Sequence, residues 1–520
     1  MSTRKISRRR FLALAAGMGA AAVGCGGRAP TPTPPAPSPT PTPLSATASP
    51  TPTPLGSPTP TPVATPTVIS RPPTGPLSVL VVGDPFQYAL EKLLPQFTES
   101  TGIRVKMETL SYDALNARLS SSFVGNTTPA DVITVDQMWN GQYFDNKWIR
   151  PLDDLIKGDA ELDLEDFLPE VLYSLNTWRG HIVTLPVAAY AQGVIYRKDV
   201  LGELGVSPPP KVPQESWTWQ AYMDALGKVH GRRVRGKRLF GTVICGAQPV
   251  PIVHMYTQLA ASNGVRWFKR FPQAPWDFTP TIDSPENVAA LEMYRALYKL
   301  SPPEAINYVW FDAGTRFAQG DVGMFYWWTP YFYLVRNNGY MSGKRSVVAD
   351  LYDVGALPAS PNHPQVVSLG GWSLGIPANS RNQDAAWRFI KWAVSRETQR
   401  AMALVPDYNY QFSDFARRSL YSDEEVRRHY PYLDVQLRMM QLGNGKLVRP
   451  PVPIYPALEG VYGLQLNQAL SGARSPQQAL KTAQTLFTNL LQGNLLLPYR
   501  GPSYDDTLES TRQLIRSLAR

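Results

Sequence analysis

The stretch LSVLVVG, residues 77–83, decides the fold, because the regular patterns of the chain begin there. It is a short apolar run that ends in glycine, as expected for a strand buried on both faces. Apolar residues then recur at the spacing of one helix face, at Leu90, Leu93, Leu94 and Phe97. We therefore predict a strand over 77–83 and a helix directly after it.

The same alternation continues along the chain. GIRVKMETL (102–110) predicts a second strand, YDALNARLSSSF (112–123) a second helix and ADVITVD (130–136) a third, buried strand. Strand–helix–strand repeats imply right-handed crossovers and a mainly parallel sheet. Ligands gather at the carboxyl ends of such strands, which here hold residues 83–88 and 136–139.

The chain is too large for one small core. About 445 residues follow from Gly75 onward, and cores of this size usually divide. We expect an α/β protein with two lobes.

The N-terminus has the pattern of an export signal. Residues 1–10 carry five basic side chains and no acidic one, and an apolar run then ends at Gly24, too short to span a bilayer. Arg8 and Arg9 resemble a twin-arginine signal, and Ala22-Val23-Gly24-Cys25 resembles a lipobox. We expect a signal peptide over 1–24 and lipid attachment at Cys25. The alternative is a plain secretory signal with an incidental cysteine.

A low-complexity segment follows the signal. Residues 29–70 hold no charged side chain and consist almost wholly of Pro, Thr, Ala and Ser. Such a composition cannot bury a core and favours extended polyproline II. We predict a disordered linker over 25–75 that holds an extracytoplasmic globule on a membrane anchor.

Net charge and cysteine content argue against nucleic-acid binding and against an intrachain disulfide. The net charge is +10, but the first 24 residues carry five of the basic groups, so the remainder carries about +5. We find no basic stripe of the kind that binds nucleic acid. With Cys25 acylated, Cys245 has no partner for a disulfide. Cys245 lies in the strand-like run LFGTVICGA, where a buried, inert thiol is expected.

Motifs along the chain resemble a known family. They are LEKLLPQFTESTGIRVKMETL, PADVITVDQMWNGQYFDNKWIRPLDDL, LPVAAYAQGVIYRKDV, FAQGDVGMFYWWTPYF, GGWSLGIPANSRNQDAAWRFIKWAVS and PALEGVYGLQLNQAL. In this order they resemble the family 1 extracellular solute-binding proteins, the sugar-binding subunits of ABC importers. Arg197 stands where the family usually has Asn. The resemblance covers roughly residues 77–495.

The resemblance implies a two-lobe, type II periplasmic-binding-protein fold with a hinge and a ligand cleft between the lobes. Carried onto this chain, lobe 1 comprises 76–187 plus 356–405 and lobe 2 comprises 188–355 plus 406–500. Crossings between the lobes fall near Pro186–Tyr190, Leu357–Pro358 and Val405–Pro406, and a tail follows over 501–520, where STRQLIRSLAR predicts an exposed helix. Lobe closure would bury the ligand from both sides.

Sugar recognition needs polar side chains for hydroxyls and aromatic rings for the C–H face. Asp136 and Trp139 supply both just after a strand, although Asp136 also suits a helix N-cap and Trp139 suits packing under a loop. Gln87 and Tyr88 follow the first strand and otherwise read as surface residues of a first helical turn. Tyr190 lies at the first expected crossing.

Further candidates come from segments that match the family. FYWWTPYFY (325–333) is rich in aromatic residues, and the resemblance implies a stacking platform at Trp327 or Trp328, whereas Phe325 and Phe332 are expected in the core. Trp372 follows two glycines, which permit close approach of the backbone. Tyr455 corresponds to another stacking position of the family. Arg316 suits an anionic ligand or, more simply, a helix surface.

The sequence argues against catalysis. Gly371-Trp372-Ser373-Leu374-Gly375 fits the G-x-S-x-G nucleophile elbow, and Asp407 and His429 follow in hydrolase order. An elbow needs a strand, a sharp turn and then a helix, whereas WSLGIP predicts one continuous strand. Motifs for zinc, redox or nucleotide chemistry are absent. We expect no catalytic residue, metal or cofactor.

The expected partners are a carbohydrate ligand, ABC permease subunits and the membrane through the lipid anchor, with no nucleic acid and a monomeric chain. Two other readings stay open. One is a secreted carbohydrate-active enzyme, which needs two carboxylates at a set separation. The other is a binding protein for a different solute, such as a polyamine, iron or a phosphate ester.

Overall fold

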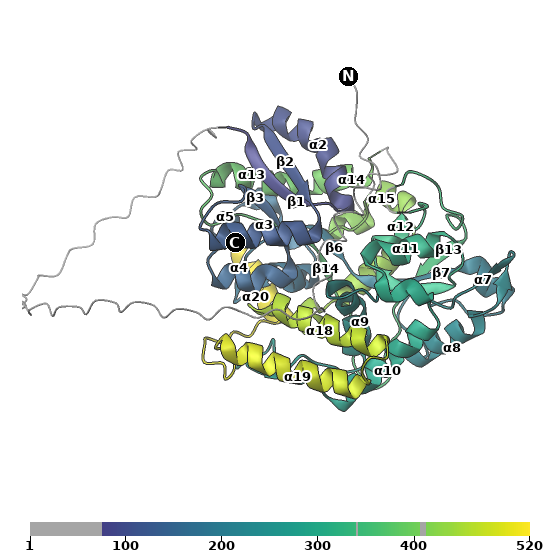
Figure 1. The fold of residues 1–520 in the computed structure, drawn as a ribbon. Helices are drawn as coiled ribbons and strands as arrows, with labels where there is room; N and C mark the ends of the chain where they lie inside the picture. Colours follow the sequence, from purple (N-terminus) through teal and green to yellow (C-terminus); the bar gives the residue numbers. More distant parts are fainter. Residues whose placement is uncertain (1–74, 340–341, 406–411) are drawn as a thin grey trace, which may run out of the picture. The chain divides into compact units, whose positions relative to one another are not determined.

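The structure is a computed structural model that describes residues 75–339, 342–405 and 412–520 (Figure 1). The expected signal peptide, Cys25 and nearly all of the linker lie outside the described residues, as do Pro406 and Asp407. Within the described ranges, none of the helices has the length and apolar character needed to cross a membrane.

A five-stranded sheet forms the first half of the architecture, in the order β2-β1-β3-β14-β6. Its strands are β1 (Leu77–Val82), β2 (Val105–Leu110), β3 (Val132–Asp136), β6 (Leu185–Tyr190) and β14 (Gly370–Gly375). β1 is parallel to β2 and β3, whereas β14 is antiparallel to β3 and β6. The three strands predicted from the start of the chain, and their parallel pairing, are therefore confirmed.

Helices connect and cover this sheet. They include α2 (Pro85–Thr101), α3 (Tyr112–Val124), α13 (Gln383–Val394) and α14 (Arg396–Ala403). The apolar face predicted for α2 is buried, and its Phe97 ring lies 5.3 Å from Phe389 and 5.2 Å from Trp392 of α13. α2 and α13, which lie about 290 residues apart in the sequence, therefore share one core. Burying these rings removes a large apolar area from water, which stabilises the packing.

A second, three-stranded antiparallel sheet has the order β12-β7-β13. It consists of β7 (Gln192–Arg197), β12 (Met324–Trp328) and β13 (Tyr352–Gly355). Ala191 alone separates β6 of the first sheet from β7 of the second, so the chain passes directly from one sheet to the other. The expected residue boundaries of the two lobes stay a prediction.

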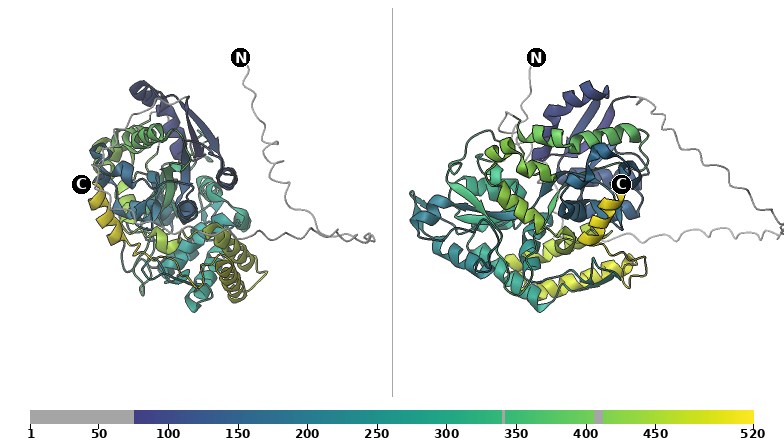
Figure 2. Two further views of the ribbon diagram at one scale, coloured as in Figure 1. Left: turned by 90° about the vertical axis from the view of Figure 1, so that its left-hand side faces the viewer. Right: turned by 180° about the vertical axis from the view of Figure 1, so that it is seen from behind.

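Helices surround the second sheet and extend beyond it (Figures 1 and 2). α18 packs against both α9 and α19. Helices here include α7 (Lys198–Glu203), α8 (Trp219–Val229), α9 (Val250–Ser262), α10 (Pro285–Lys299), α11 (Trp310–Ala318), α16 (Leu433–Gln441), α18 (Tyr455–Leu470) and α19 (Pro476–Gly493).

Short elements make up most of the rest. The strands are β4 (Thr177–Trp178), β5 (His181–Ile182), β8 (Arg233–Val234), β9 (Lys237–Arg238), β10 (Phe268–Arg270) and β11 (Asp277–Pro280). The helices are α4 (Asn140–Asp145), α5 (Asp153–Ile156), α6 (Pro169–Val171), α12 (Tyr331–Leu334), α15 (Glu424–His429), α17 (Gly445–Val448) and the π-helical η4 (Leu172–Asn176).

The C-terminal segment differs from the exposed helix that we predicted. It does form a helix, α20 (Leu508–Leu518), but Ile515 and Leu518 are buried and the helix packs against α6 and η4. Just before it, Asp506 is buried and bonds Lys446 at 2.5 Å. Asp506 and α20 therefore pack against the fold, whereas Gly501, Pro502, Tyr504 and Asp505 before them are exposed.

Two other local predictions have clear outcomes. The G-x-S-x-G segment lies within β14, as its strand pattern predicted, and Ser373 Oγ is buried and accepts a hydrogen bond of 2.9 Å from Asn176. Cys245 is buried as expected, but its run is not a strand, because the backbone bonds loop carbonyls at Leu300 and Ala305. Burial raises the pKa of the Cys245 thiol well above its usual value, which keeps it protonated.

Candidate functional site

Asp136 ends β3 and has two roles. One carboxylate oxygen accepts the Met138 amide at 3.4 Å, which is the N-cap role that we kept as an alternative. The other accepts the hydroxyl of Tyr112 at 3.2 Å. Trp372 lies directly opposite Asp136 in the β3–β14 register. The carboxyl end of β3 therefore places a carboxylate beside two aromatic rings.

Those rings belong to a larger aromatic group. The ring of Tyr112 lies 5.5 Å from Trp139, 5.3 Å from Trp310 and 5.9 Å from Trp372, and Trp139 lies 6.1 Å from Trp372. Aromatic pairs at these separations attract each other beyond their burial. Trp310 begins α11, which leads into β12 of the second sheet, so the group joins elements of both sheets.

Two glycines before Trp372 permit this packing. Gly371 has a φ of 132°, and a Cβ there would lie 2.1 Å from the Ala188 carbonyl oxygen. A Cβ on Gly370 would lie 2.9 Å from the Trp328 ring and 3.0 Å from the Arg449 guanidinium. The close backbone approach predicted for this segment is confirmed, because no larger residue fits at either position without a shift.

Asp84 lies at the end of β1 and was not among the predicted site residues. The Tyr190 hydroxyl and the Trp372 indole donate hydrogen bonds to its carboxylate. Burial raises the pKa of Asp84 to about 6, although both hydrogen bonds act in the opposite direction. Nearby Asp414 is buried, accepts the Thr329 hydroxyl at 2.6 Å and has a pKa well above the usual value.

A second polar group comes from the other half of the chain. Arg449 approaches His254 Nε2 at 2.9 Å through its Nη1, and Glu459 lies 3.4 Å from the same nitrogen. On the other side of the imidazole ring, the Trp310 indole donates to Nδ1 at 3.4 Å. Trp328 covers the Arg449 guanidinium at 5.2 Å. This group therefore contacts the aromatic rings described above.

Burial dominates the ionisation of these groups. It lowers the pKa of His254 well below 6.5, and neighbouring Arg449 lowers it further, so the imidazole is neutral. Burial raises the pKa of Glu459 to about 7 and also raises the pKa of Asp136. Both carboxyl groups therefore take up protons at a higher pH than exposed carboxyls do.

We call these residues together the central cluster. Its members share direct contacts with one another and side chains able to bond hydroxyls or stack on a sugar. Most are buried, whereas Asp84, Tyr112 and Trp310 are half-buried. They are Asp84, Tyr112, Asp136, Trp139, Tyr190, His254, Trp310, Trp328, Trp372, Arg449, Tyr455 and Glu459.

Six of the nine predicted ligand-binding residues belong to the central cluster: Asp136, Trp139, Tyr190, Trp328, Trp372 and Tyr455. Tyr455 donates its hydroxyl to Glu459 at 2.9 Å. Trp327 is fully buried beside the cluster, where its indole donates to the Trp310 carbonyl at 3.1 Å, so it supports the wall. Phe325 and Phe332 are in the core as expected.

Gln87 and Tyr88 lie on the first turn of α2. The Gln87 amide nitrogen donates to Glu91 at 2.6 Å, whereas its carbonyl oxygen is buried without a hydrogen-bond partner. Tyr88 is half-buried. Arg316 of α11 bonds Asp321 at 2.6 Å and Glu304 at 3.2 Å, which agrees with the helix-surface reading.

Sequence reasoning missed six members of the cluster. Asp84 directly follows the first strand and had the same positional signal as Gln87. Tyr112, His254, Trp310, Arg449 and Glu459 carry no local signal, because their neighbours in the cluster come from remote segments.

Unpartnered polar atoms mark where the cluster can bond a ligand. Arg449 is 1% exposed, and its Nε has no partner; no carboxylate among the described residues lies within ion-pair distance of its guanidinium. The Gln137 side-chain oxygen is likewise buried and unpartnered, while its nitrogen donates to the Leu369 carbonyl at 2.7 Å. Buried polar groups normally have partners, so these atoms are candidates for ligand contacts.

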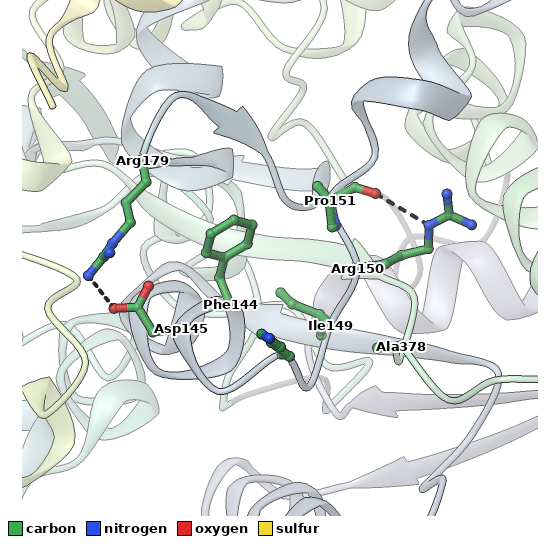
Figure 3. A pocket seen from close by; sticks show the side chains of 8 residues that line it. Phe144, Asp145, Ile149, Arg150, Pro151, Arg179 and Ala378 are labelled. Carbon is green, nitrogen blue, oxygen red and sulfur yellow. Dashed lines mark hydrogen bonds and ion pairs between the residues drawn. The ribbon is translucent and has the colours of Figure 1, made fainter. Parts of the chain in front are cut away.

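A hollow elsewhere on the protein is a weaker candidate (Figure 3). Phe144, Ile149 and Ala378 line it, together with charged side chains. Two of its cations already have partners, since Arg179 bonds Asp145 at 2.7 Å and Arg150 bonds Asp154. The hollow therefore offers little unpaired polarity to a ligand.

Metal binding has no support in the part of the chain that the structure describes, where no group of three His, Cys, Asp or Glu side chains is arranged to hold an ion.

Known proteins resemble this chain over most of its length. A mannitol-binding protein of Pseudomonas aeruginosa is 26% identical over 430 residues, covering 78% of this chain and 91% of that one. An ABC transporter solute-binding protein of Agrobacterium radiobacter, solved with ribitol, is 30% identical with a TM-score of 0.70, covering 80% and 99% of the two chains. A solute-binding protein of Agrobacterium vitis, solved with bound D-mannitol, is 26% identical with a TM-score of 0.70, covering 81% and 99%.

These similarities establish the fold as that of two-lobe periplasmic binding proteins. The profile of the bacterial extracellular solute-binding proteins matches residues 83–400, which is more than half of the chain. The chain belongs to the family of bacterial extracellular solute-binding proteins, which work outside the cytoplasm.

Proposed function

We propose that this chain is the solute-binding subunit of an ABC importer and that its ligand is a small carbohydrate or sugar alcohol. The observation that carries the proposal is the central cluster, in which Asp84 and Asp136 at the ends of two strands lie beside the ring of Trp372. Carboxylates accept hydrogen bonds from hydroxyls, and an indole face packs on C–H groups.

The charges of the cluster suit a neutral, hydroxyl-rich ligand. Arg449 donates hydrogen bonds, whereas carboxylates such as Asp136 and Glu459 accept them. Together with Asp84, these groups can donate to the oxygen of a ligand hydroxyl and accept its hydrogen. A phosphate ester would meet three carboxyl groups and a single guanidinium in the cluster, and repulsion from the carboxyl groups would weaken its binding. The relatives named for mannitol and ribitol support the same class of ligand.

The size of the cluster favours a short ligand. The ring centroids of Tyr112, Trp139, Trp310 and Trp372 pair at 5.3 to 6.1 Å, so a ligand can enter among these rings only when the contacts open. An oligosaccharide would need these ring contacts to open widely.

We infer that closure of the two lobes captures the ligand, because of the way in which the chain connects the two sheets. The chain passes between the sheets at Ala191, and Tyr112 of α3 meets Trp310 of α11 across the division. We place lobe 1 at 76–187 plus 356–405 and lobe 2 at 188–355 plus 406–500. A ligand that contacts both lobes stabilises the closed state by its extra affinity for that state.

The proposed cellular setting follows from the N-terminal sequence. We infer a twin-arginine signal over 1–24, lipid attachment at Cys25 and a monomeric chain that delivers its ligand, chemically unchanged, to membrane permeases. Substitution Cys25→Ala should release the chain from membranes and abolish labelling by a radioactive fatty acid. Unchanged labelling would refute the anchor.

A thermal-shift screen tests the ligand class directly. Mannitol, ribitol, maltose, spermidine and glycerol phosphate are compared, and a ligand at 100 times its Kd should stabilise the fold by about 2.7 kcal/mol. We expect stabilisation by a sugar or sugar alcohol. Stabilisation by spermidine or glycerol phosphate alone would overturn the proposed ligand class.

Product analysis separates binding from catalysis. Maltose and longer oligosaccharides are incubated with the protein and examined by chromatography. We expect every sugar to be recovered intact, whereas cleavage would establish the carbohydrate-active enzyme in place of the receptor.

A further inference from the structure

A β-hairpin on the surface carries an unusual density of positive charge. β8 and β9 form it within the sequence HGRRVRGKR, residues 230–238. Five of its side chains are exposed cations: Arg232, Arg233, Arg235, Lys237 and Arg238. We call these five residues the basic hairpin. The ligand-binding proposal does not use it.

The hairpin is firmly built. Arg235 and Gly236 have φ values of 49° and 79°, the left-handed pair that closes a tight two-residue turn. Val234 is buried beneath the hairpin, and Leu239 donates its amide to the Arg232 carbonyl at 2.8 Å. The cations are therefore displayed on a fixed scaffold.

Most of this charge is not neutralised within the protein. Arg235 bonds Asp199 at 3.2 Å, but Asp199 is shared with Arg197 at 2.6 Å. Among the described residues, no carboxylate lies within ion-pair distance of the other four members of the basic hairpin.

The arrangement also opposes stability. Arg233 and Arg238 are paired directly across the two strands. Like charges at such a position repel each other and destabilise a hairpin. A feature that weakens the free protein and leaves several cations exposed is explained more readily by an anionic partner than by folding.

The chemistry of the hairpin identifies the kind of partner. Guanidinium groups match phosphate oxygens in pairs. The exposed side chains include no aromatic ring, which stacking on nucleic-acid bases would need, and no apolar group of the kind found at the centre of protein interfaces. The exposed cations of the hairpin instead suit electrostatic attraction to the phosphate headgroups of a membrane surface.

We propose that the basic hairpin docks the protein on an anionic phospholipid membrane. The proposal goes beyond ligand binding. It rests on the extracytoplasmic location of the family and does not depend on the identity of the ligand. Such docking would orient the globule at the surface where the membrane subunits of an importer lie.

Vesicle co-sedimentation of the full chain tests the proposal. Binding to phosphatidylcholine vesicles is compared with binding to vesicles of equal parts phosphatidylcholine and phosphatidylglycerol. The test variant is Arg232→Gln/Arg233→Gln/Arg238→Gln. The matched control is Arg104→Gln/Lys106→Gln/Arg118→Gln, which removes three exposed cations from β2, α3 and their vicinity. Every protein keeps the same basic N-terminus.

We expect the wild type and the control to bind the anionic vesicles, and the hairpin variant to bind on the order of 100-fold more weakly, at about fivefold for each cation removed. Raising the ionic strength from about 0.05 M to about 0.5 M should release the wild type. Equal binding by the two variants, or equal binding of the wild type to neutral vesicles, would overturn the proposal.

Two further readouts keep the result interpretable. Ligand affinity of the hairpin variant should match the control, and its thermal stability should equal or exceed that of the control, which shows that folding and the central cluster are intact. Unchanged vesicle binding together with weaker association with importer membrane subunits would assign the hairpin to a protein partner and refute the lipid proposal. Failure of every ligand in the thermal-shift screen would refute the proposed function and leave the vesicle result standing.

Discussion

Trp372 contacts four members of the central cluster. Its ring contacts Tyr112 and Trp139, its indole bonds Asp84, and its backbone pairs with Asp136. If the ligand stacks on the Trp372 ring, removing this ring should weaken ligand binding far more than it destabilises distant parts of the fold. Hot-spot aromatic residues at binding sites typically contribute about 2 kcal/mol or more.

Substitution Trp372→Ala should therefore weaken ligand binding by about 30-fold, since 1.4 kcal/mol corresponds to a factor of ten. Trp372→Phe keeps a ring and should lose less. Isothermal titration calorimetry with the best ligand of the screen measures both. Trp392→Ala on α13 is the control, because this ring packs on Phe97 and Phe389. Unaltered affinity in Trp372→Ala would remove this residue from the site.

Asp84 gives the stability of the free protein a characteristic pH dependence. Its pKa is about 6 in the folded chain, against an ordinary value of 3.8. Between these values the folded state holds more protons than the unfolded state, so its contribution favours folding at low pH and is lost as the pH rises through about 6.

Between pH 4 and pH 7, the unfolding free energy of the wild type should decrease relative to that of Asp84→Asn. About two pKa units correspond to a change on the order of 3 kcal/mol. Urea denaturation at several pH values measures it. Asp113→Asn, an exposed site on α3, serves as the comparison. A pH-independent difference for Asp84→Asn would contradict the assignment.

At the scale of elements, the C-terminal segment shows how an ion pair secures a helix. Lys446 of α17 is fully buried, donates to Thr177 at 2.9 Å and bonds Asp506, which precedes α20. Removing one partner of such a pair leaves an uncompensated charge in the interior, which typically destabilises by about 3–5 kcal/mol.

We therefore expect Asp506→Ala to lower the unfolding free energy by about 3–5 kcal/mol, and Asp506→Leu combined with Lys446→Met to recover most of the loss. Urea denaturation gives the values. Arg516→Ala breaks the exposed pair with Glu509 on the same helix and should cost less than about 1 kcal/mol. A stable Asp506→Ala variant would show that α20 is held by its apolar contacts alone.

The elements that the sequence predicted well are those with a strong local period. The strands β1 and β3 and the buried face of α2 follow from their apolar spacing alone. The burial of α20 did not, because its partners in α6 and η4 lie more than 300 residues earlier. The run around Cys245 was read as a strand because it is apolar, but its backbone partners are loop carbonyls.

The same distinction holds for the candidate site. Asp136 and Trp139 were predictable from their position after a strand, and Trp372 from the two glycines before it. His254, Arg449 and Glu459 come from three separate segments, and no spacing in the sequence indicates that they meet. Long-range contacts determine this part of the site.

At the scale of the whole folded unit, contacts between the two halves determine how ligand binding relates to closure. Tyr112 and Trp310 face each other at 5.3 Å, and Trp310 also donates to His254. An aromatic pair of this kind contributes about 1 kcal/mol beyond its burial. With the lobe boundaries that we propose, this contact forms between the lobes, so it should stabilise the closed state only, and a ligand that needs closure should depend on it.

Trp310→Ala should therefore weaken ligand binding about fivefold and reduce the compaction that ligand causes, while Phe311→Ala on the same helix should change both less. Small-angle X-ray scattering with and without saturating ligand measures the radius of gyration, and calorimetry measures the affinity. The wild type should become more compact when the ligand binds. A radius of gyration that ligand leaves unchanged in the wild type would mean that the site is occupied without lobe closure, and the hinge mechanism would then be wrong.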